Sequence, residues 1–437
     1  MILHLFFINF CFLFVLAVLI FVSKKFSSEK SSFYLNLAIC SLSIFLHLSL
    51  ALLTAKGDSV YFARVMIRLT EEPLTGFYDR MGITYPPLFN YLCLVMGKLL
   101  RLLQIPFDPY NRTFIFCIKL PGILCEFFMA GTIYSTVKKH VSWEKRTVAL
   151  YLILLNPGYL FVTSYICQVD AIYSFFMLLT VYFITKNHLK LSYFSFAAAI
   201  LFKFQAIFIT PVLIFAVVRQ VILHDFHWRR FFSHLFTGLS AIGCIGISYL
   251  PFIYNFTTGT FSKGGIFHNF TSSVASYGKA SQNAYNFWTL TGYNEIFHSE
   301  LFGPLSCNHW GTLFIVLLVA LSIFLFIKHW DTPDIYPMLS ALLISGTYCF
   351  AVKMMSRYLY PAIVLLILGY AIKPTVKRLL CAVCFSICFF LVTGFDYLVY
   401  PWTVYRKDLI LPYIISFYAI FCFGLLTYTI WSEKVPK

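Results

Sequence analysis

The chain has 437 residues, of which 60% are hydrophobic and 11% are charged, and its formal net charge at pH 7 is +16. Soluble domains carry about 25% charged residues, so this composition excludes a water-soluble fold and indicates a polytopic membrane protein. Only helices and closed barrels span a bilayer, and the apolar runs lack the alternation of barrel strands, so we predict an all-α fold. The basic charge is typical of cytoplasmic loops, and no long basic soluble segment indicates a nucleic-acid partner.

The apolar runs predict about thirteen transmembrane helices in a single domain, residues 1–437, with short basic inner turns and large outer loops that carry short interfacial helices. This pattern places the N-terminus outside and the C-terminus inside. Residues 191–219 are too long for one span and short for two, and Lys203 interrupts them, so two short helices are expected to meet near the outer face. Other expected spans cover residues 2–22, 33–55, 114–134, 148–166 and 232–254, and four or five more follow residue 310.

The first sustained polar stretch runs from Gly57 to Leu88 and begins with Asp58. A carboxylate at the end of a span is partly desolvated, so its pKa can suit proton abstraction. It can equally cap the helix that follows, by accepting a hydrogen bond from the Tyr61 amide. Residues 60–69 have helical spacing and predict a short helix on the membrane surface, and residues 88–105 predict a second interfacial or tilted helix.

Two further polar segments on the outer side could contact a sugar. The first is a turn-rich aromatic segment, and the second lies in the outer loop over residues 255–310. Aromatic faces and carboxylates suit sugar hydroxyls, but a structural loop on the bilayer surface explains the first segment as well, and a solvated loop explains the second. The residues concerned are Tyr78, Asp79, Arg80 and Tyr85 in the first segment and Asn286 and Trp288 in the second.

Isolated charges mark the outer ends of three other apolar runs. Asp170 follows Gln168 at a helix junction, where a costly carboxylate indicates a functional site or caps the next span. Lys203 has no charged neighbour in the sequence, so it either snorkels to the interface or needs an anion such as phosphate. Arg357 is a second such cation, and a guanidinium can hold a phosphate by two parallel hydrogen bonds. The histidines and cysteines show no metal-ligand spacing, so we expect no metal and no other cofactor, although a divalent ion is the alternative.

With these residues, the chain resembles the GT-C superfamily of integral-membrane glycosyltransferases, and within it the bacterial branch that depends on polyprenyl-phosphate sugars. The resemblance extends over about residues 50–365. The matching elements in order are Asp58; Tyr78-Asp79; Tyr85-Pro86-Pro87; Gln168 and Asp170, with Cys167 where Gly is usual; Lys203, Gln205 and Ala206, with Phe204 in place of Pro; Asn286-Phe287-Trp288; and Arg357-Tyr358 with Pro361, where Met355-Ser356 replace a common His-Glu.

The resemblance implies a module over about residues 33–220, which residues 221–437 complete into a groove for a lipid donor. It implies inverting transfer of a hexosyl or pentosyl group from a polyprenyl-phosphate sugar to a glycan, lipid or protein acceptor on the outer face. Asp58 would take the acceptor proton, and Lys203 and Arg357 would stabilise the leaving phosphate. The membrane would be a bacterial plasma membrane, or the endoplasmic reticulum of a eukaryote. The predicted substrate contacts are Tyr78, Asp79, Arg80, Tyr85, Gln168, Asp170, Gln205, Asn286 and Trp288.

Two other functions fit the same composition. A transporter or flippase of a lipid-linked saccharide would also need an apolar groove and phosphate-binding cations, but it should place essential charges in the middle of the membrane. A glycan ligase or polymerase would use a lipid diphosphate donor, and more than two essential outer cations would favour it.

Overall fold

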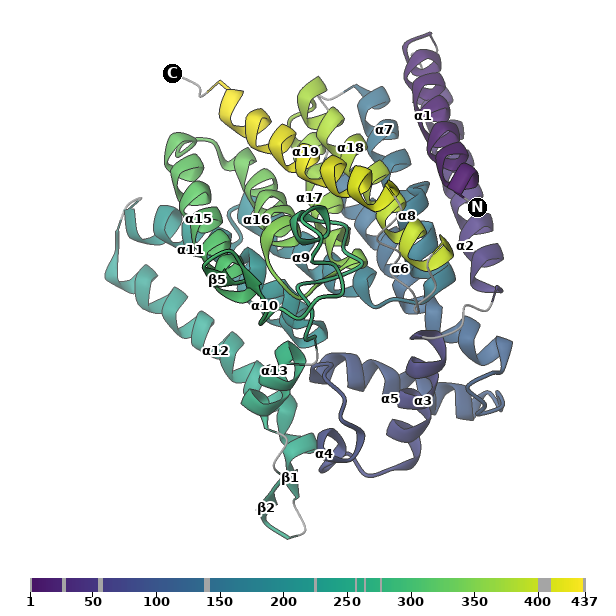
Figure 1. Ribbon diagram of the computed structural model, residues 1–437, viewed down its shortest axis with the longest axis vertical. Coiled ribbons are helices and arrows are strands. Elements are labelled where there is room, and N and C mark those ends of the chain that lie inside the picture. Colours follow the sequence, from purple (N-terminus) through teal and green to yellow (C-terminus); the bar gives the residue numbers. More distant parts are fainter. Residues whose placement is uncertain are drawn as a thin grey trace.

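The computed structural model describes residues 2–25, 29–53, 58–136, 142–223, 226–255, 258–262, 265–275, 277–399 and 410–434, and these are mostly helical (Figure 1). Within these ranges, nine helical stretches are long and apolar enough to cross a membrane, and three shorter apolar helices accompany them. The protein is therefore an all-α polytopic membrane protein, as predicted, while the total of about thirteen spans stays a prediction. Ala55 and Gly57, where the second span and the outer loop were expected to meet, lie outside the described residues.

The first half of the chain contains eleven of the described α-helices and three short helical segments of other pitch. The α-helices are α1 (Ile2–Lys25), α2 (Glu29–Ala51), α3 (Asp58–Glu71), α4 (Phe77–Met81), α5 (Pro87–Leu102), α6 (Arg112–Thr136), α7 (Trp143–Leu154), α8 (Pro157–Tyr159), α9 (Asp170–Thr185), α10 (Leu189–Phe202) and α11 (Thr210–Val217). The π-helical segments are η1 (Leu160–Ile166) and η3 (Val218–Leu223), and the 3-10 segment is η2 (Phe204–Ile209).

The second half adds eight described α-helices, three short helical segments and three pairs of two-residue strands. The helices are α12 (Trp228–Ile253), α13 (Ile266–Ala275), α14 (Phe287–Leu290), α15 (Cys307–Lys328), η4 (Pro333–Ile335), α16 (Tyr336–Phe350), η5 (Ser356–Leu359), α17 (Tyr360–Ile372), α18 (Val376–Gly394), η6 (Phe395–Val399) and α19 (Leu411–Ser432). The strand pairs are antiparallel β1 (Tyr254–Asn255) with β2 (Thr260–Phe261), parallel β3 (Ser281–Gln282) with β6 (Met354–Met355), and antiparallel β4 (Leu301–Phe302) with β5 (Leu305–Ser306).

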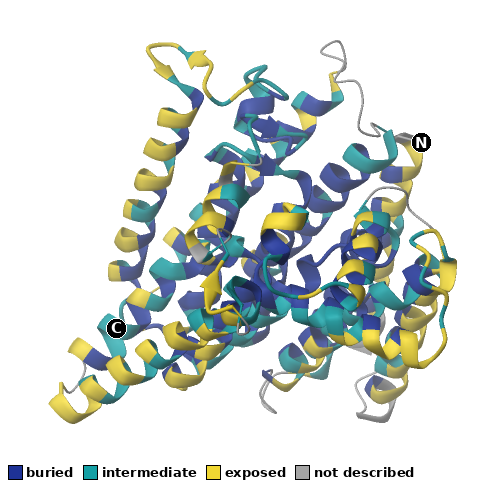
Figure 2. Ribbon diagram, turned by 90° about the horizontal axis from the view of Figure 1, so that it is seen from below, coloured by how far each residue is buried: buried dark blue, intermediate teal, exposed yellow. Residues whose placement is uncertain are grey.

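Burial separates central spans from peripheral ones. The apolar window of the span Trp143–Ile166 is 94% buried and that of Val376–Val399 is 72% buried, whereas those in α2 and α12 are only 17% buried. Figure 2 shows the same contrast, with buried residues gathered centrally and exposed ones along the outlying helices. The exposed side chains of α12 include large apolar ones such as Phe236 and Ile242. In a membrane protein such side chains face lipid, so α12 lies at the edge of the bundle, where Figure 1 places it.

The two helices expected in the first outer loop are present. α3 buries Phe62, Met66 and Leu69 and exposes Arg64 and Arg68, which is the amphipathic pattern of a helix with one face on the protein. α5 covers the second predicted segment and packs against α3. Both lie at one end of the spans, beside α4 and the β1–β2 hairpin (Figure 1).

Two helical spans are interrupted, and the breaks position residues of the candidate site that is described in the next subsection. The predicted pair of short helices over residues 191–219 is confirmed, because Lys203 has extended backbone angles and separates α10 from η2 and α11. The predicted span 148–166 is present within the helical stretch Trp143–Ile166, but it is not one regular helix. Asn156 interrupts it by capping a new helix, accepting hydrogen bonds from the Gly158 and Tyr159 amides, and the chain then continues as η1. A π-helical segment of this kind is often found at functional sites.

Candidate active site

Six side chains from distant segments meet at the end of the spans where α3 lies. We call them the Asp58 cluster. Asp58 is the first residue of α3, Gln168 and Asp170 flank the turn from η1 into α9, and Lys203 separates α10 from η2. Arg357 lies in η5, and Tyr397 in η6. The members are Asp58, Gln168, Asp170, Lys203, Arg357 and Tyr397.

The backbone at Cys167 turns the chain toward Asp58. Its φ is 72°, in the left-handed region that non-glycine residues rarely adopt, and its amide donates to Val162 O to close η1. The next residue, Gln168, donates a hydrogen bond through Nε2 to Asp58 Oδ2. A positive φ explains why glycine suits this position, and it makes Cys167 a strained residue beside the proposed site.

Arg357 lies between the two carboxylates and donates a hydrogen bond to neither of them. Its Nη1 is 3.9 Å from Asp58 Oδ2, and its Nε is 3.9 Å from Asp170 Oδ2. Nη1 instead donates to Tyr397 Oη at 2.8 Å, and Tyr397 donates to Asp58 Oδ2 at 3.4 Å. Over the described residues, Nε of Arg357 has no hydrogen-bond partner, although the side chain is only 7% exposed. A buried guanidinium with an unused donor can bind a further acceptor.

Lys203 is paired with Asp170. Its ammonium donates to Asp170 Oδ1 at 2.8 Å and lies over the rings of Tyr173 and Tyr358, at 5.1 and 4.8 Å from their centroids. The sequence showed no charged neighbour, but the fold supplies one from 33 residues away. Burial lowers the pKa of Lys203 to about 8, and the charge of Asp170 opposes that shift.

The predicted site residues divide into two groups. The structure brings Asp58, Gln168, Asp170, Lys203 and Arg357 together. Tyr85 lies near them, close enough for the charge of Arg357 to act on its phenol. Burial raises the pKa of Tyr85 well above 10, and Arg357 opposes that shift. Gln205 is half-buried in η2, two residues after Lys203.

The second group has contacts elsewhere. Tyr78 packs on Tyr249 and Phe252 and accepts a hydrogen bond from Asn90 Nδ2. Asp79 and Arg80 are exposed, and Arg80 bonds to the carbonyls of Pro73 and Thr75 and to Glu72. Asn286 caps α14 and donates to Tyr348 O, while Trp288 is fully buried and donates to Phe350 O. These contacts stabilise the two outer loops.

Two residues that the sequence reasoning did not assign stand beside Arg357. Tyr397 bridges Arg357 and Asp58, and Asp396 accepts a hydrogen bond of 2.5 Å from Ser356 Oγ. Adjacent polar residues at the outer end of the apolar run 376–399 were the available signal. Their partners could not be inferred, because Tyr397 and Asp58 are 339 residues apart.

The acidic members of the cluster lie beside cations of the chain itself. No group of three or more His, Cys, Asp or Glu side chains able to hold one is found in the described part of the chain. The two acidic members, Asp58 and Asp170, both face the guanidinium of Arg357, so a cation already lies between them. Their charges are balanced by Arg357 and Lys203.

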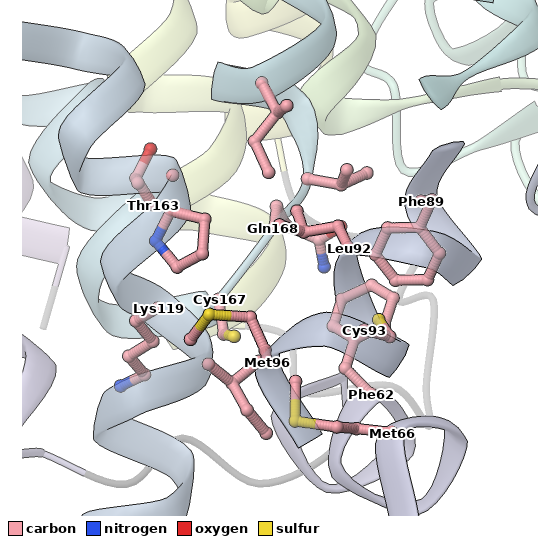
Figure 3. Close-up of a pocket in the computed structure, with 15 residues that line it drawn as sticks. Phe62, Met66, Phe89, Leu92, Cys93, Met96, Lys119, Thr163, Cys167 and Gln168 are labelled. Carbon is pink, nitrogen blue, oxygen red and sulfur yellow. The ribbon is translucent and has the colours of Figure 1, made fainter. Parts of the chain in front are cut away.

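A small cavity of about 30 Å³ lies behind Gln168. Figure 3 shows Thr163, Cys167 and Gln168 on one side of it and Phe62, Phe89 and Cys93 on the other. The volume has room for at least one water molecule, and the amide of Gln168 is a polar group in the lining, whereas the Thr163 hydroxyl is bonded to Glu126. Gln168 Oε1, which has no hydrogen-bond partner among the residues described, is a free acceptor there.

The fold and the Asp58 cluster together define a polytopic membrane protein with a charged site at one end of its helices, partly open through Asp58, whose side chain is 18% exposed. No family model matches the chain, and no curated protein matches its sequence. Among solved structures, the crystal structure of ArnT from Cupriavidus metallidurans bound to undecaprenyl phosphate is similar to this chain. The match covers 92% of this chain and 77% of that one, with 12% identity and a TM-score of 0.46. Such a likeness is too distant to carry an argument, so the function must come from this chain's own residues.

Proposed function

We propose that the protein is an inverting glycosyltransferase of the GT-C type, which moves a sugar from a polyprenyl-phosphate donor to an acceptor on the outer face of its membrane. One observation carries the proposal. Arg357 is buried between two carboxylates, at 3.9 Å from each, and its Nε donor is unused within the described structure. An incoming phosphate oxygen can accept that hydrogen bond at little cost, because no existing bond has to break.

Asp58 is the group best placed to be the base. Its side chain is 18% exposed, whereas Asp170 is fully buried and bound to Lys203. Gln168 and Tyr397 both donate to Oδ2 of Asp58, which orients the carboxylate. The acceptor hydroxyl gives its proton to Asp58 as its oxygen bonds the anomeric carbon. The bond from that carbon to the phosphate oxygen breaks, and the phosphate leaves with the electron pair.

The leaving phosphate gains charge, and Arg357 with Lys203 would stabilise it. Arg357 is the direct ligand in this proposal, since its donors are not used by Asp58 or Asp170. Lys203 uses one of its three N–H donors on Asp170, with Nζ at 2.8 Å from Oδ1. In this proposal it stabilises the phosphate through its charge and not by a direct hydrogen bond. Preorganised cations of this kind act without reorganisation during the reaction.

An apolar groove provides room for the polyprenyl tail. A cavity of about 520 Å³ opens between α10, α11 with η3, and α12. Its lining is almost wholly aliphatic and aromatic, with Tyr193 and His234 as the polar exceptions. Ile200 on this wall is one helical turn from Lys203, so a tail in the groove would place its phosphate near the Asp58 cluster. We place the protein in a bacterial plasma membrane, or in the endoplasmic reticulum of a eukaryote.

The test is to incubate purified protein with a panel of polyprenyl-phosphate sugars and candidate acceptors, and to measure released polyprenyl phosphate. At least one pair should give turnover with inversion at the anomeric carbon. Release that needs a lipid diphosphate donor, or retention of configuration, would overturn the proposal.

A transporter or flippase is a second candidate, because one observation favours it. His47 Nε2 and Glu126 Oε2 lie 3.1 Å apart inside two spans, with both side chains fully buried, and ionisable residues within a membrane often lie on transport pathways. Liposomes carrying the protein and a fluorescent polyprenyl-phosphate sugar distinguish the two. Equilibration of the donor between leaflets without acceptor or cleavage would favour transport.

A further inference from the structure

A second polar cluster lies inside the membrane spans, outside the Asp58 cluster. Glu126 of α6 accepts hydrogen bonds through Oε1 from Thr163 Oγ1 and from Tyr360 Oη, the latter at 2.6 Å. Its Oε2 is 3.1 Å from His47 Nε2, and His47 Nδ1 is 2.6 Å from Ser164 Oγ. We call these five residues, which come from α2, α6, η1 and α17, the Glu126 cluster.

Burying the ionisable groups of this cluster costs free energy. Both ionisable members, Glu126 and His47, have no exposed side-chain area, and an ionisable group in apolar surroundings is costly unless hydrogen bonds compensate its burial. Oε1 of Glu126 accepts both hydroxyl bonds, so it joins η1 and α17 to α6, whereas Oε2 lies beside His47 Nε2 without a hydrogen bond among the described residues. The close approach of α6 to η1 depends on Gly122, because a Cβ at that position would lie 2.9 Å from Thr163 Cγ2.

Two of the segments that Glu126 joins carry members of the Asp58 cluster, namely Gln168 and Arg357. Tyr360 follows Arg357 by three residues, and the segment from Arg357 to Tyr360 spans the change from η5 to α17. Thr163 precedes Gln168 by five residues, and only the strained turn at Cys167 separates η1 from Gln168. The hydroxyls of Thr163 and Tyr360 bond to the same carboxylate. They therefore hold together the two segments that bear Gln168 and Arg357.

We propose that Glu126 is a positioning residue, which holds Gln168 and Arg357 at the spacing that the Asp58 site requires. This inference rests on the proposed function for its kinetic consequence and on the contacts above for its geometry. Glu126 touches neither donor nor acceptor in this arrangement. Loss of one of its hydroxyl partners should let η1 and η5 move apart, so that Asp58 loses the orienting bond from Gln168 while the lipid groove is unchanged.

The experiment compares Tyr360→Phe and Thr163→Val with Tyr151→Phe. Tyr151 is a matched control, because it is a buried phenol with one hydrogen bond, to Phe12 O at 2.8 Å, between α7 and α1. Steady-state kinetics should show kcat lowered about tenfold in Tyr360→Phe and Thr163→Val. The donor KM should change less than about twofold in Thr163→Val, whose segment bears Gln168, and should rise in Tyr360→Phe, whose segment bears the phosphate ligand Arg357. Glu126→Gln should keep more activity than Glu126→Ala, because the amide oxygen can still accept both hydroxyl bonds.

Amide hydrogen exchange provides a readout that does not depend on activity. In Tyr360→Phe, exchange should rise both around Tyr360 and in residues 164–170, which lie on another segment, and Tyr151→Phe should leave both unchanged. Exchange that rises only around Tyr360, or equal kcat losses in Tyr360→Phe and Tyr151→Phe, would overturn the inference. If wild-type protein transfers no sugar from any donor, the proposed function fails, and the exchange data still decide whether Glu126 couples the two segments.

Discussion

Each end of the α17–α18 pair lies beside a cluster of two cations and at least two carboxylates, but the two clusters are bonded very differently. At one end, in what we call the Arg378 cluster, Arg378 donates to both oxygens of Glu433 at 2.6 and 2.7 Å and to Asp334 Oδ2 at 3.0 Å. Lys373 completes this set at 3.0 Å from Glu433. At the other end, Arg357 stands 3.9 Å from both of its carboxylates.

This difference in bonding distinguishes a structural ion network, the Arg378 cluster, from a proposed binding site, the Asp58 cluster. The Arg378 guanidinium also donates to the carbonyls of Asp334 and Gly369. These hydrogen bonds are all made within the protein, and they join the ends of α17, α18 and α19. The Arg357 guanidinium keeps an unused donor, and its neighbour Asp58 is partly exposed. Similar sets of charges are therefore bonded within the protein at one end, and at the other they leave a donor that we propose binds phosphate.

Asp58→Asn should give the largest effect. The amide cannot take the acceptor proton, and loss of a general base typically costs about 10²–10⁴ in rate. Sugar transfer by the purified variant measures this, and size-exclusion behaviour and thermal stability should match wild type. Glu71→Gln is the control, because Glu71 lies at the other end of α3 in an exposed pair with Arg101, which is worth little. Wild-type turnover in Asp58→Asn would remove the assigned base.

Arg378→Met should affect stability and spare catalysis. Removing one partner of a buried ion pair leaves uncompensated carboxylates, at a cost of about 3–5 kcal/mol. Denaturation in mixed micelles should show that loss, while turnover per folded molecule stays near wild type. A variant that is stable but inactive would mean that the two ends of α17 and α18 do not differ in the way proposed.

The pH dependence should differ at the two ends. Lys203 has a pKa of about 8 in the folded protein, below its ordinary 10.5, so it loses its charge first in the folded state. Donor affinity should fall as the pH rises through about 8, because a phosphodiester stays anionic there. The unfolded chain binds the extra proton between about pH 8 and 10.5, so the contribution of Lys203 to stability rises over that window. A donor affinity that is constant from pH 7 to 10 would contradict the role of Lys203.

Stability should instead be lost toward acid through the Arg378 cluster. Burial alone would raise the pKa of Glu433, but hydrogen bonds and charge from Arg378 outweigh it and lower the pKa below the ordinary 4.5. A lowered carboxyl pKa contributes stability that is present above 4.5 and is lost as the pH falls through the folded value. Thermal melts between pH 3 and 7 measure this, and Arg378→Met should flatten the dependence.

Cys167→Gly should have the smallest effect. Glycine adopts a φ of 72° without strain, which favours the variant by up to about 1 kcal/mol, while loss of the buried thiol opposes the gain. Activity should stay within about threefold of wild type, and thermal stability should hardly change. Cys167→Val is the contrasting variant, because a β-branched side chain is poorly tolerated at positive φ, and it should be less stable and less active.

The sequence predicted much of the fold because apolar runs, interfacial amphipathic segments and isolated charges are local signals. The membrane class, the helices over residues 58–71 and 87–102, and the break at Lys203 follow from such signals. The sequence also selected five members of the Asp58 cluster, because isolated polar groups at the ends of apolar runs stand out and follow the motif order of the family that the sequence resembles.

The sequence could not predict which side chains from distant segments of the chain contact one another. Lys203 lacked a partner until Asp170 was placed beside it, and Tyr397 had no visible link to Asp58. Asn286 and Trp288 carry groups that suit a sugar, but their hydrogen bonds are used to cap α14 and to hold the end of α16. Glu126 did carry a signal, since it is a carboxylate in the middle of an apolar run, and only its partners were hidden.

The most direct test of the central claim is the affinity of a polyprenyl phosphate for Arg357→Met, titrated beside wild type. Truncating a buried charged group that binds an anion costs at least about 2 kcal/mol, so affinity should fall by about thirtyfold or more. Arg101→Met, an exposed arginine on α5 paired only at the surface with Glu71, should bind as wild type does. Equal affinity in Arg357→Met and Arg101→Met would contradict the proposal that the unused donor of Arg357 is the phosphate site.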